Sequence, residues 1–113
     1  MRGLTVRWSL AGAPAGVEDA LRAYVEGTSH SRYSGREDLR FKTWRMLGGE
    51  WFEGCYVFET SSARESFEQA FKEAGAGSPS SQIIGSAPLL IEACEIVAVA
   101  EGASGFVEWA SSS

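Results

Sequence analysis

Apolar residues recur along the chain with two different periods, and their order predicts alternating strands and helices. Residues 4–10 alternate apolar and polar side chains, which is typical of a half-buried strand. Residues 17–25 carry apolar side chains at helical spacing, and this spacing returns over residues 63–74. The apolar run over residues 89–100 is rich in β-branched residues near its end and favours a last strand that includes them.

The most aromatic stretch, residues 39–58, predicts a β-hairpin. Two apolar runs flank Gly48 and Gly49, which supply the positive φ angles of a tight turn. A two-residue turn would place one mixed set of side chains on a common face: Lys42, Trp44, Met46, Trp51, Glu53 and Cys55. Tyr56 would then lie on the opposite face, and a shift of one residue would reverse this relationship. We expect the mixed face to lie against a ligand or a second subunit.

The connections between these elements carry their own signals. Residues 28–38 are polar and predict a loop. Ser62 and Glu65 have capping-box spacing, which places the start of the second long helix, and Gly75 places its end. The stretch that follows is rich in glycine, serine and proline, but Ile84 and its apolar neighbour predict a short helical turn within it.

The predicted order is β-α-β-β-α-β, an α+β ferredoxin-like unit with a four-stranded antiparallel sheet. In this topology the strands lie in the order 4-1-3-2, and both helices cover one face of the sheet. The other face would be bare in a single chain, and such a face is typical of an interface. We therefore expect a homodimer that closes two sheets face to face.

The length predicts one ferredoxin-like domain, over residues 1–102, followed by a C-terminal tail over residues 103–113. Phe106 and Trp109 are large aromatic residues, which a solvated tail rarely contains. We expect part of the tail to pack on its own domain or on a partner subunit.

The net charge of the chain argues against one functional class, the nucleic-acid-binding proteins. A net charge of −5 argues against a nucleic-acid-binding role, which needs a concentrated basic surface. The sequence shows no signal peptide or membrane span, so a cytoplasmic location is the default expectation.

Cys55 and Cys94 lie in strands that the topology separates, and we interpret them as small buried hydrophobic residues without a disulfide. Zinc, haem, flavin and nicotinamide signatures are absent from the sequence, so no cofactor is expected.

Two segments of the hairpin resemble the YdhR-like monooxygenase family. They are Phe41-Lys42-Thr43-Trp44 and Glu53-Gly54-Cys55-Tyr56-Val57-Phe58, with a further likeness at Glu95-Ile96-Val97-Ala98. That family belongs to the dimeric α/β-barrel superfamily, which also contains antibiotic-biosynthesis monooxygenases. Glu53 stands where the family has the first of a glycine pair. The resemblance implies a homodimer whose subunits each enclose a pocket, and relatives in the superfamily oxidise polycyclic phenols with O₂ without a metal or prosthetic group.

Four residues are candidates for the site, each with a structural alternative. Trp44 can stack on a planar ligand, or it can be a core or interface tryptophan. Lys42 shares its face and can stabilise an enolate or phenolate, or it can be a solvated lysine. Tyr56 can donate a hydrogen bond to a substrate oxygen, or it can simply pack in the sheet. His30, the only histidine, can act as a general base from the loop, or it can be merely exposed.

These residues and the resemblance favour a cofactor-independent monooxygenase acting on an aromatic or electron-rich small molecule. The first alternative is a non-catalytic dimer that binds a small molecule on the same fold. The second is a structural dimerisation module. A pocket beside Trp44 that contains a titratable group favours catalysis, whereas a filled core there favours the structural module.

Overall fold

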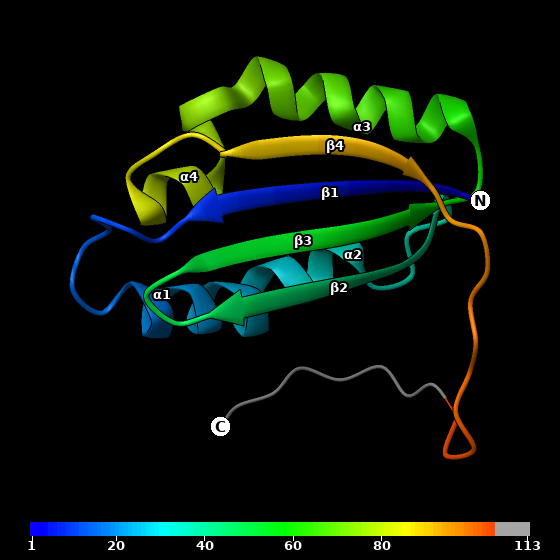
Figure 1. Ribbon diagram of the computed structural model, residues 1–113, viewed down its shortest axis with the longest axis horizontal. Coiled ribbons are helices and arrows are strands. Elements are labelled where there is room, and N and C mark those ends of the chain that lie inside the picture. Colours follow the sequence, from blue (N-terminus) through cyan, green and yellow to red (C-terminus); the bar gives the residue numbers. More distant parts are fainter. Residues whose placement is uncertain (106–113) are drawn as a thin grey trace.

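The computed structural model describes residues 1–105, except for the side chain of Ser31. Four strands form one antiparallel sheet: β1 (Arg2–Ser9), β2 (Leu39–Leu47), β3 (Trp51–Phe58) and β4 (Leu90–Glu95). Their order across the sheet is β2-β3-β1-β4 (Figure 1). This confirms the ferredoxin-like α+β fold predicted from the hydrophobic pattern.

The helices lie on one side of this sheet. In Figure 1, α1 (Val17–Tyr24) and α2 (His30–Tyr33) lie behind β2 and β3, and α3 (Ser61–Ala74) runs alongside β4. Two short elements follow α3, the 3₁₀ turn η2 (Gly75–Gly77) and the helix α4 (Pro79–Ile84). The short helix predicted around Ile84 is therefore confirmed.

The prediction of a loop over residues 28–38 is wrong for its first half. A π-helical turn, η1 (Val25–Ser29), joins α1 directly to α2. Gly27 and Thr28 have low helix propensity, but tertiary contacts can override propensity. Here Ser29 is buried and its hydroxyl accepts a hydrogen bond from the indole of Trp44 at 3.1 Å. The extra residue of a π turn is a known way to redirect a helix face, often at a functional site.

The start of α3 also differs from the prediction. Thr60, rather than Ser62, is the N-cap, because its hydroxyl accepts a hydrogen bond from the backbone N–H of Ala63 at 3.2 Å. Gly75 ends the helix with a φ of 50°, as predicted. The apolar stripe of α3 packs on the core through Ala63, Phe67 and Phe71.

The hairpin register differs by one residue from that of a two-residue turn. Trp51 pairs with Leu47, so the loop contains residues 48–50. The backbone N–H of Glu50 donates to the carbonyl of Leu47 at 2.9 Å, and the carbonyl of Glu50 accepts from Leu10 at 2.9 Å. The register is thus fixed by a contact with the end of β1, which a local pattern does not contain. As a result Tyr56 pairs with Lys42 and lies on its face of the sheet.

The core lies between the helices and this face. Strand residues supply most of it, and α1 and α4 contribute the rest. The buried residues are Leu4, Val6, Trp8, Leu10, Val17, Leu21, Phe52, Tyr56, Phe58 and Ile84. Trp8 also donates its indole N–H to Ser81 of α4 at 2.9 Å, which satisfies its polar atom inside the core. Each large side chain buried in this way stabilises the fold by about 1.5–3 kcal/mol.

The opposite face of the sheet carries a charged cluster. Glu53 is only 1% exposed, although no helix covers it, because Arg7 and Arg45 both form ion pairs with its carboxylate. Both guanidinium groups also lie over the ring of Trp51, at 4.5 and 5.1 Å from its centre. Burial raises the pKa of the Glu53 carboxyl, but hydrogen bonds from the two arginines outweigh this and lower its pKa overall. The two-residue turn predicted Glu53 on the face of Lys42 and Trp44, but the observed register pairs it with Arg45 and places it on the opposite face.

The last strand is shorter than predicted. β4 ends at Glu95, and Val97 is 86% exposed. β1 begins at Arg2, and within residues 1–105 the last backbone hydrogen bond along this edge runs from the N–H of Ile96 to the carbonyl of Met1 at 3.1 Å. The aromatic tail residues singled out in the sequence lie outside the described residues.

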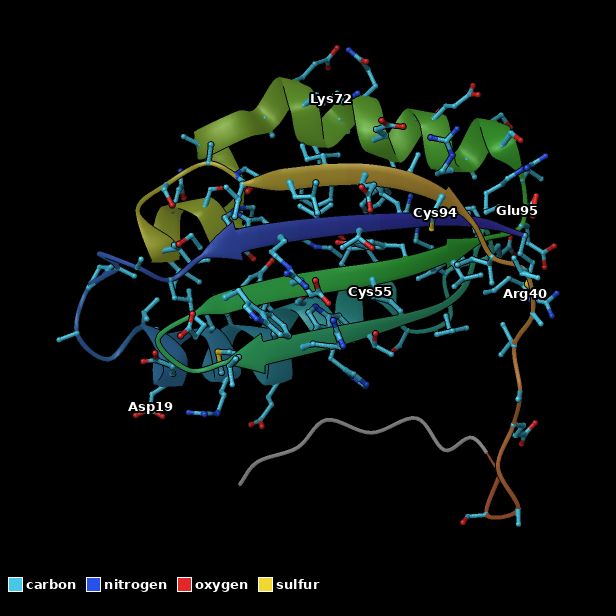
Figure 2. All side chains as sticks on the ribbon, in the orientation of Figure 1. Asp19, Arg40, Cys55, Lys72, Cys94 and Glu95 are labelled. Carbon is cyan, nitrogen blue, oxygen red and sulfur yellow. The ribbon has the colours of Figure 1, made fainter. Side chains whose placement is uncertain are left out.

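Cys55 and Cys94 are both free thiols, as predicted. They lie on β3 and β4, with β1 between them (Figure 2). The prediction that both are buried is wrong, because Cys94 is exposed and Cys55 is only half-buried. No helix in the part of the chain described here is long and apolar enough to span a membrane.

Candidate active site

A cavity of about 290 Å³ lies between the helices and the sheet. Aromatic side chains from every layer form its walls, with Trp8, Phe52 and Tyr56 from the sheet and Phe67 and Phe71 from α3. Its polar lining comes from Ser29, Arg32, Tyr33, Lys42, Ser78 and Ser80, among others. An apolar cavity with a few convergent polar groups is the usual form of a small-molecule site. Trp44 lines it too, so the space beside this residue is a cavity and not a filled core.

Gly54 makes room for the two polar side chains at the centre of this cavity. It pairs with Trp44 and lies on the same strand as Tyr56, two residues away. A Cβ atom at this position would lie 3.1 Å from the hydroxyl oxygen of Tyr56 and 3.2 Å from Cε of Lys42. Both distances are tighter than ordinary van der Waals contact. The glycine therefore allows the Lys42 and Tyr56 side chains to meet over the sheet.

The amino group of Lys42 is enclosed by aromatic rings. Its Nζ lies 3.7 Å from the centre of the Tyr33 ring, 4.3 Å from that of Tyr56 and 4.4 Å from that of Trp44. Among residues 1–105, Lys42 forms no ion pair. Burial, followed by the positive charges of Arg32 and Arg36, lowers the pKa of Lys42 to about 6. The ring faces act in the opposite direction, because they attract the ammonium form.

Trp44 is held in one orientation. Its indole N–H donates to Ser29 at 3.1 Å, and its ring packs against those of His30 and Tyr33, with centres 5.8 and 6.1 Å apart. The polar N–H of the indole therefore has a hydrogen-bond acceptor in Ser29, the last residue of η1. The ring itself lines the cavity as a flat apolar wall.

The two tyrosines supply neutral hydroxyl groups. Tyr56 is 3% exposed, and burial raises its pKa well above the ordinary value of 10. Burial also raises the pKa of Tyr33, whose ring lies edge-on to that of Tyr56 with centres 5.7 Å apart. Both side chains stay protonated near neutral pH and can donate a hydrogen bond to a ligand oxygen.

His30 packs against Trp44 but faces a different cavity. It lines a second cavity, of about 200 Å³, whose walls also include Tyr33, Lys42 and Trp44. It does not line the larger cavity, among whose walls are Trp44, Lys42 and Tyr56. The larger cavity therefore brings together three of the four candidate residues, and the fourth, His30, lines only the second of these cavities.

Sequence reasoning missed Tyr33, Ser29 and Gly54 as parts of the site. Ser29 and Tyr33 fall within the loop predicted over residues 28–38, although Val25, Ser29 and Tyr33 have the i, i+4, i+8 spacing of one helix face. This spacing could have indicated that the helix continues to Tyr33. The role of Gly54 depends on the register of β2 and β3, which was not available from the sequence.

No protein-family model matches this chain, and a search of curated proteins found no significant match. What the structure shows is the ferredoxin-like α+β fold with its four-stranded antiparallel sheet. Within residues 1–105, no cluster of three or more His, Cys, Asp and Glu side chains is arranged to hold a metal ion.

Proposed function

We propose that this protein binds a planar aromatic or electron-rich molecule in the larger cavity and oxygenates it with O₂, as a YdhR-like monooxygenase. One observation carries the proposal: a lysine amino group without a carboxylate partner in the described chain faces an aromatic cavity. A filled core beside Trp44 would have favoured a purely structural module. A cavity without a titratable group would have favoured binding alone.

The chemistry follows from the residues that line the cavity. The neutral amine of Lys42 removes a proton from a phenol or an anthrone-like CH₂ group, and the resulting ammonium stabilises the anion. The electron-rich anion passes one electron to O₂, and the two radicals combine to a peroxide. Loss of water from the peroxide converts CH₂ and O₂ to C=O and H₂O. Tyr56 donates a hydrogen bond to the substrate oxygen, and Trp44 stacks on its ring.

Oxygen uptake tests this proposal. Metal-stripped protein in the presence of a chelator is compared with its Lys42→Met, Trp44→Ala and Tyr56→Phe variants on a panel of anthrones, naphthols and polycyclic phenols. Uptake that persists with the chelator and falls at least about tenfold in Lys42→Met supports general-base catalysis. The matched control is Lys72→Met, which should leave uptake unchanged, because Lys72 is exposed and paired with Glu68. Binding of the same compounds without uptake would favour the non-catalytic alternative.

We also propose that the helix-free face of the sheet is covered by a second copy of the chain. Leu47 on β2 and Leu90 on β4 are 53% and 37% exposed on this face, on either side of the Glu53 cluster. When two copies face each other, these exposed apolar side chains can pack around the charged clusters at the middle of each sheet. Native mass spectrometry at micromolar concentration should show a dimer, and Leu47→Glu should shift it to monomer. A monomer in the unsubstituted protein contradicts this arrangement.

A further inference from the structure

The sequence contains two lysines, and they lie in opposite surroundings. Lys42 lines the cavity, where its Nζ faces the rings of Tyr33, Trp44 and Tyr56. Lys72 lies on the outer side of α3, and its Nζ forms an ion pair with Glu68 at 2.9 Å (Figure 2). Lys72 can therefore serve as a reference in the same chain when the reactivity of the Lys42 amine is measured.

The groups around Lys42 favour the neutral, nucleophilic amine. Arg32 and Arg36 place positive charge near it, and the aromatic walls remove water from it. The nearby Tyr33 and Tyr56 are neutral phenols, and the thiol of Cys55 is kept protonated by burial and by Glu53. A lysine in an apolar pocket next to other cations is the usual environment of a Schiff-base lysine.

We propose that Lys42 forms a Schiff base with an aromatic aldehyde or ketone that enters the larger cavity. The Nζ lone pair attacks the carbonyl carbon, and a proton moves from nitrogen to oxygen to give a carbinolamine. The carbinolamine hydroxyl then leaves as water while the C=N bond forms, so no oxidant or reductant is needed. The hydroxyl of Tyr56, which meets the Lys42 side chain over Gly54, is positioned to give the leaving group its proton.

The lining of the cavity also indicates the kind of carbonyl compound. Trp44, Phe67 and Phe71 provide flat apolar walls for an aromatic ring. Arg32 is the guanidinium group on the lining, and it matches a carboxylate on the ligand. An aromatic carbonyl compound that bears a carboxylate therefore fits best. This inference shares the cavity with the proposed oxygenation but needs neither a phenol nor O₂, so either can fail alone.

The test is reductive trapping on the full chain under anaerobic conditions. Native protein is incubated near pH 7 with 4-carboxybenzaldehyde and sodium cyanoborohydride, which reduces an imine to a stable amine. Cleavage at glutamate separates Lys42 from Lys72, and mass spectrometry measures the carboxybenzyl group on each. We expect the initial rate at Lys42 to exceed that at Lys72 by at least about tenfold, because an ordinary lysine is almost fully protonated at this pH. Equal rates, or an unreactive Lys42, would overturn the proposal.

Two further measurements separate a built site from simple chemical reactivity. In protein unfolded by urea the two lysines should react at equal rates, since the cavity is lost. Benzaldehyde, which lacks the carboxylate, should trap Lys42 more slowly than 4-carboxybenzaldehyde, and Arg32→Gln should remove that difference. A preference for Lys42 that persists in urea would show that the fold does not cause it, which contradicts the proposal. Oxygen uptake is measured separately, so its absence leaves this result unaffected.

Discussion

Lys42 and Tyr56 are directly paired residues of neighbouring strands, and the Nζ of Lys42 lies 4.3 Å from the centre of the Tyr56 ring. The pairing places an amine beside a phenol that is protonated, on a face of the sheet that the helices cover. Neither group has a charged partner of opposite sign among residues 1–105. Their roles in the proposed chemistry, as base and as hydrogen-bond donor, both depend on this contact.

The half-buried Lys42, enclosed by aromatic rings, should make the stability of the protein depend on pH. Its pKa is about 6 in the folded state and about 10.4 in an unfolded chain, so the unfolded state binds more protons between these values. Stability must therefore rise as pH increases through this window. We expect Lys42→Met to be more stable than the parent near pH 6.5, with the difference shrinking by about 1–3 kcal/mol by pH 9. Urea denaturation at both pH values measures this.

Lys72→Met is the matched control for that series. Lys72 is half-exposed and lies on the outer side of α3, so its removal should shift the free energy of unfolding by less than about 1 kcal/mol at both pH values. A pH-independent difference between the Lys42→Met variant and the parent would show that Lys42 stays charged in the folded state.

Gly54→Ala should close the centre of the cavity. The added Cβ would lie 3.1 Å from the Tyr56 hydroxyl and 3.2 Å from Lys42 Cε, so both side chains have to move. We expect binding of a fluorescent naphthol to weaken at least about tenfold, with a loss of stability of about 1–2 kcal/mol from overpacking. In Gly102→Ala the new Cβ meets nothing within 4 Å, so this variant should bind like the parent. Unchanged binding by Gly54→Ala would place the ligand elsewhere.

The sequence predicted the fold better than the site because the two depend on different information. Hydrophobic periodicity is local, and it correctly indicated the four strands, the helices α1 and α3, and their order. The hairpin register depends on the contact between Leu10 and Glu50, which are distant in the chain. Strand alternation placed Lys42 and Trp44 together, but only the observed register adds Tyr56 to them. The sequence did not indicate Tyr33 because the polar residues before it predict a loop, whereas the helix continues through η1 and α2.

Ser29→Ala should loosen the Trp44 wall. The substitution leaves the indole N–H without the partner that it has at 3.1 Å, in a part-buried position. We expect a loss of stability of about 1–2 kcal/mol and weaker binding of an aromatic ligand, because Trp44 can then turn. Urea denaturation and near-UV circular dichroism measure the two effects. Ser34→Ala is the control, since its hydroxyl donates to the His30 carbonyl at an exposed site. Equal effects of both variants would contradict a specific role for Ser29.

Glu53→Gln should weaken the charged cluster on the helix-free face without affecting the cavity. The folded-state pKa of Glu53 is lowered, so its contribution to stability is present above the unfolded value of about 4.3 and is lost as pH falls through the folded value. Arg7 and Arg45 are partly exposed, and water screens the charge left on them. We therefore expect a loss of about 1–3 kcal/mol at pH 7 that becomes smaller below pH 4. Ligand binding in the larger cavity should stay at the parental level, because Glu53 lies on the other side of the sheet. A matching loss of binding would show that the two faces are coupled.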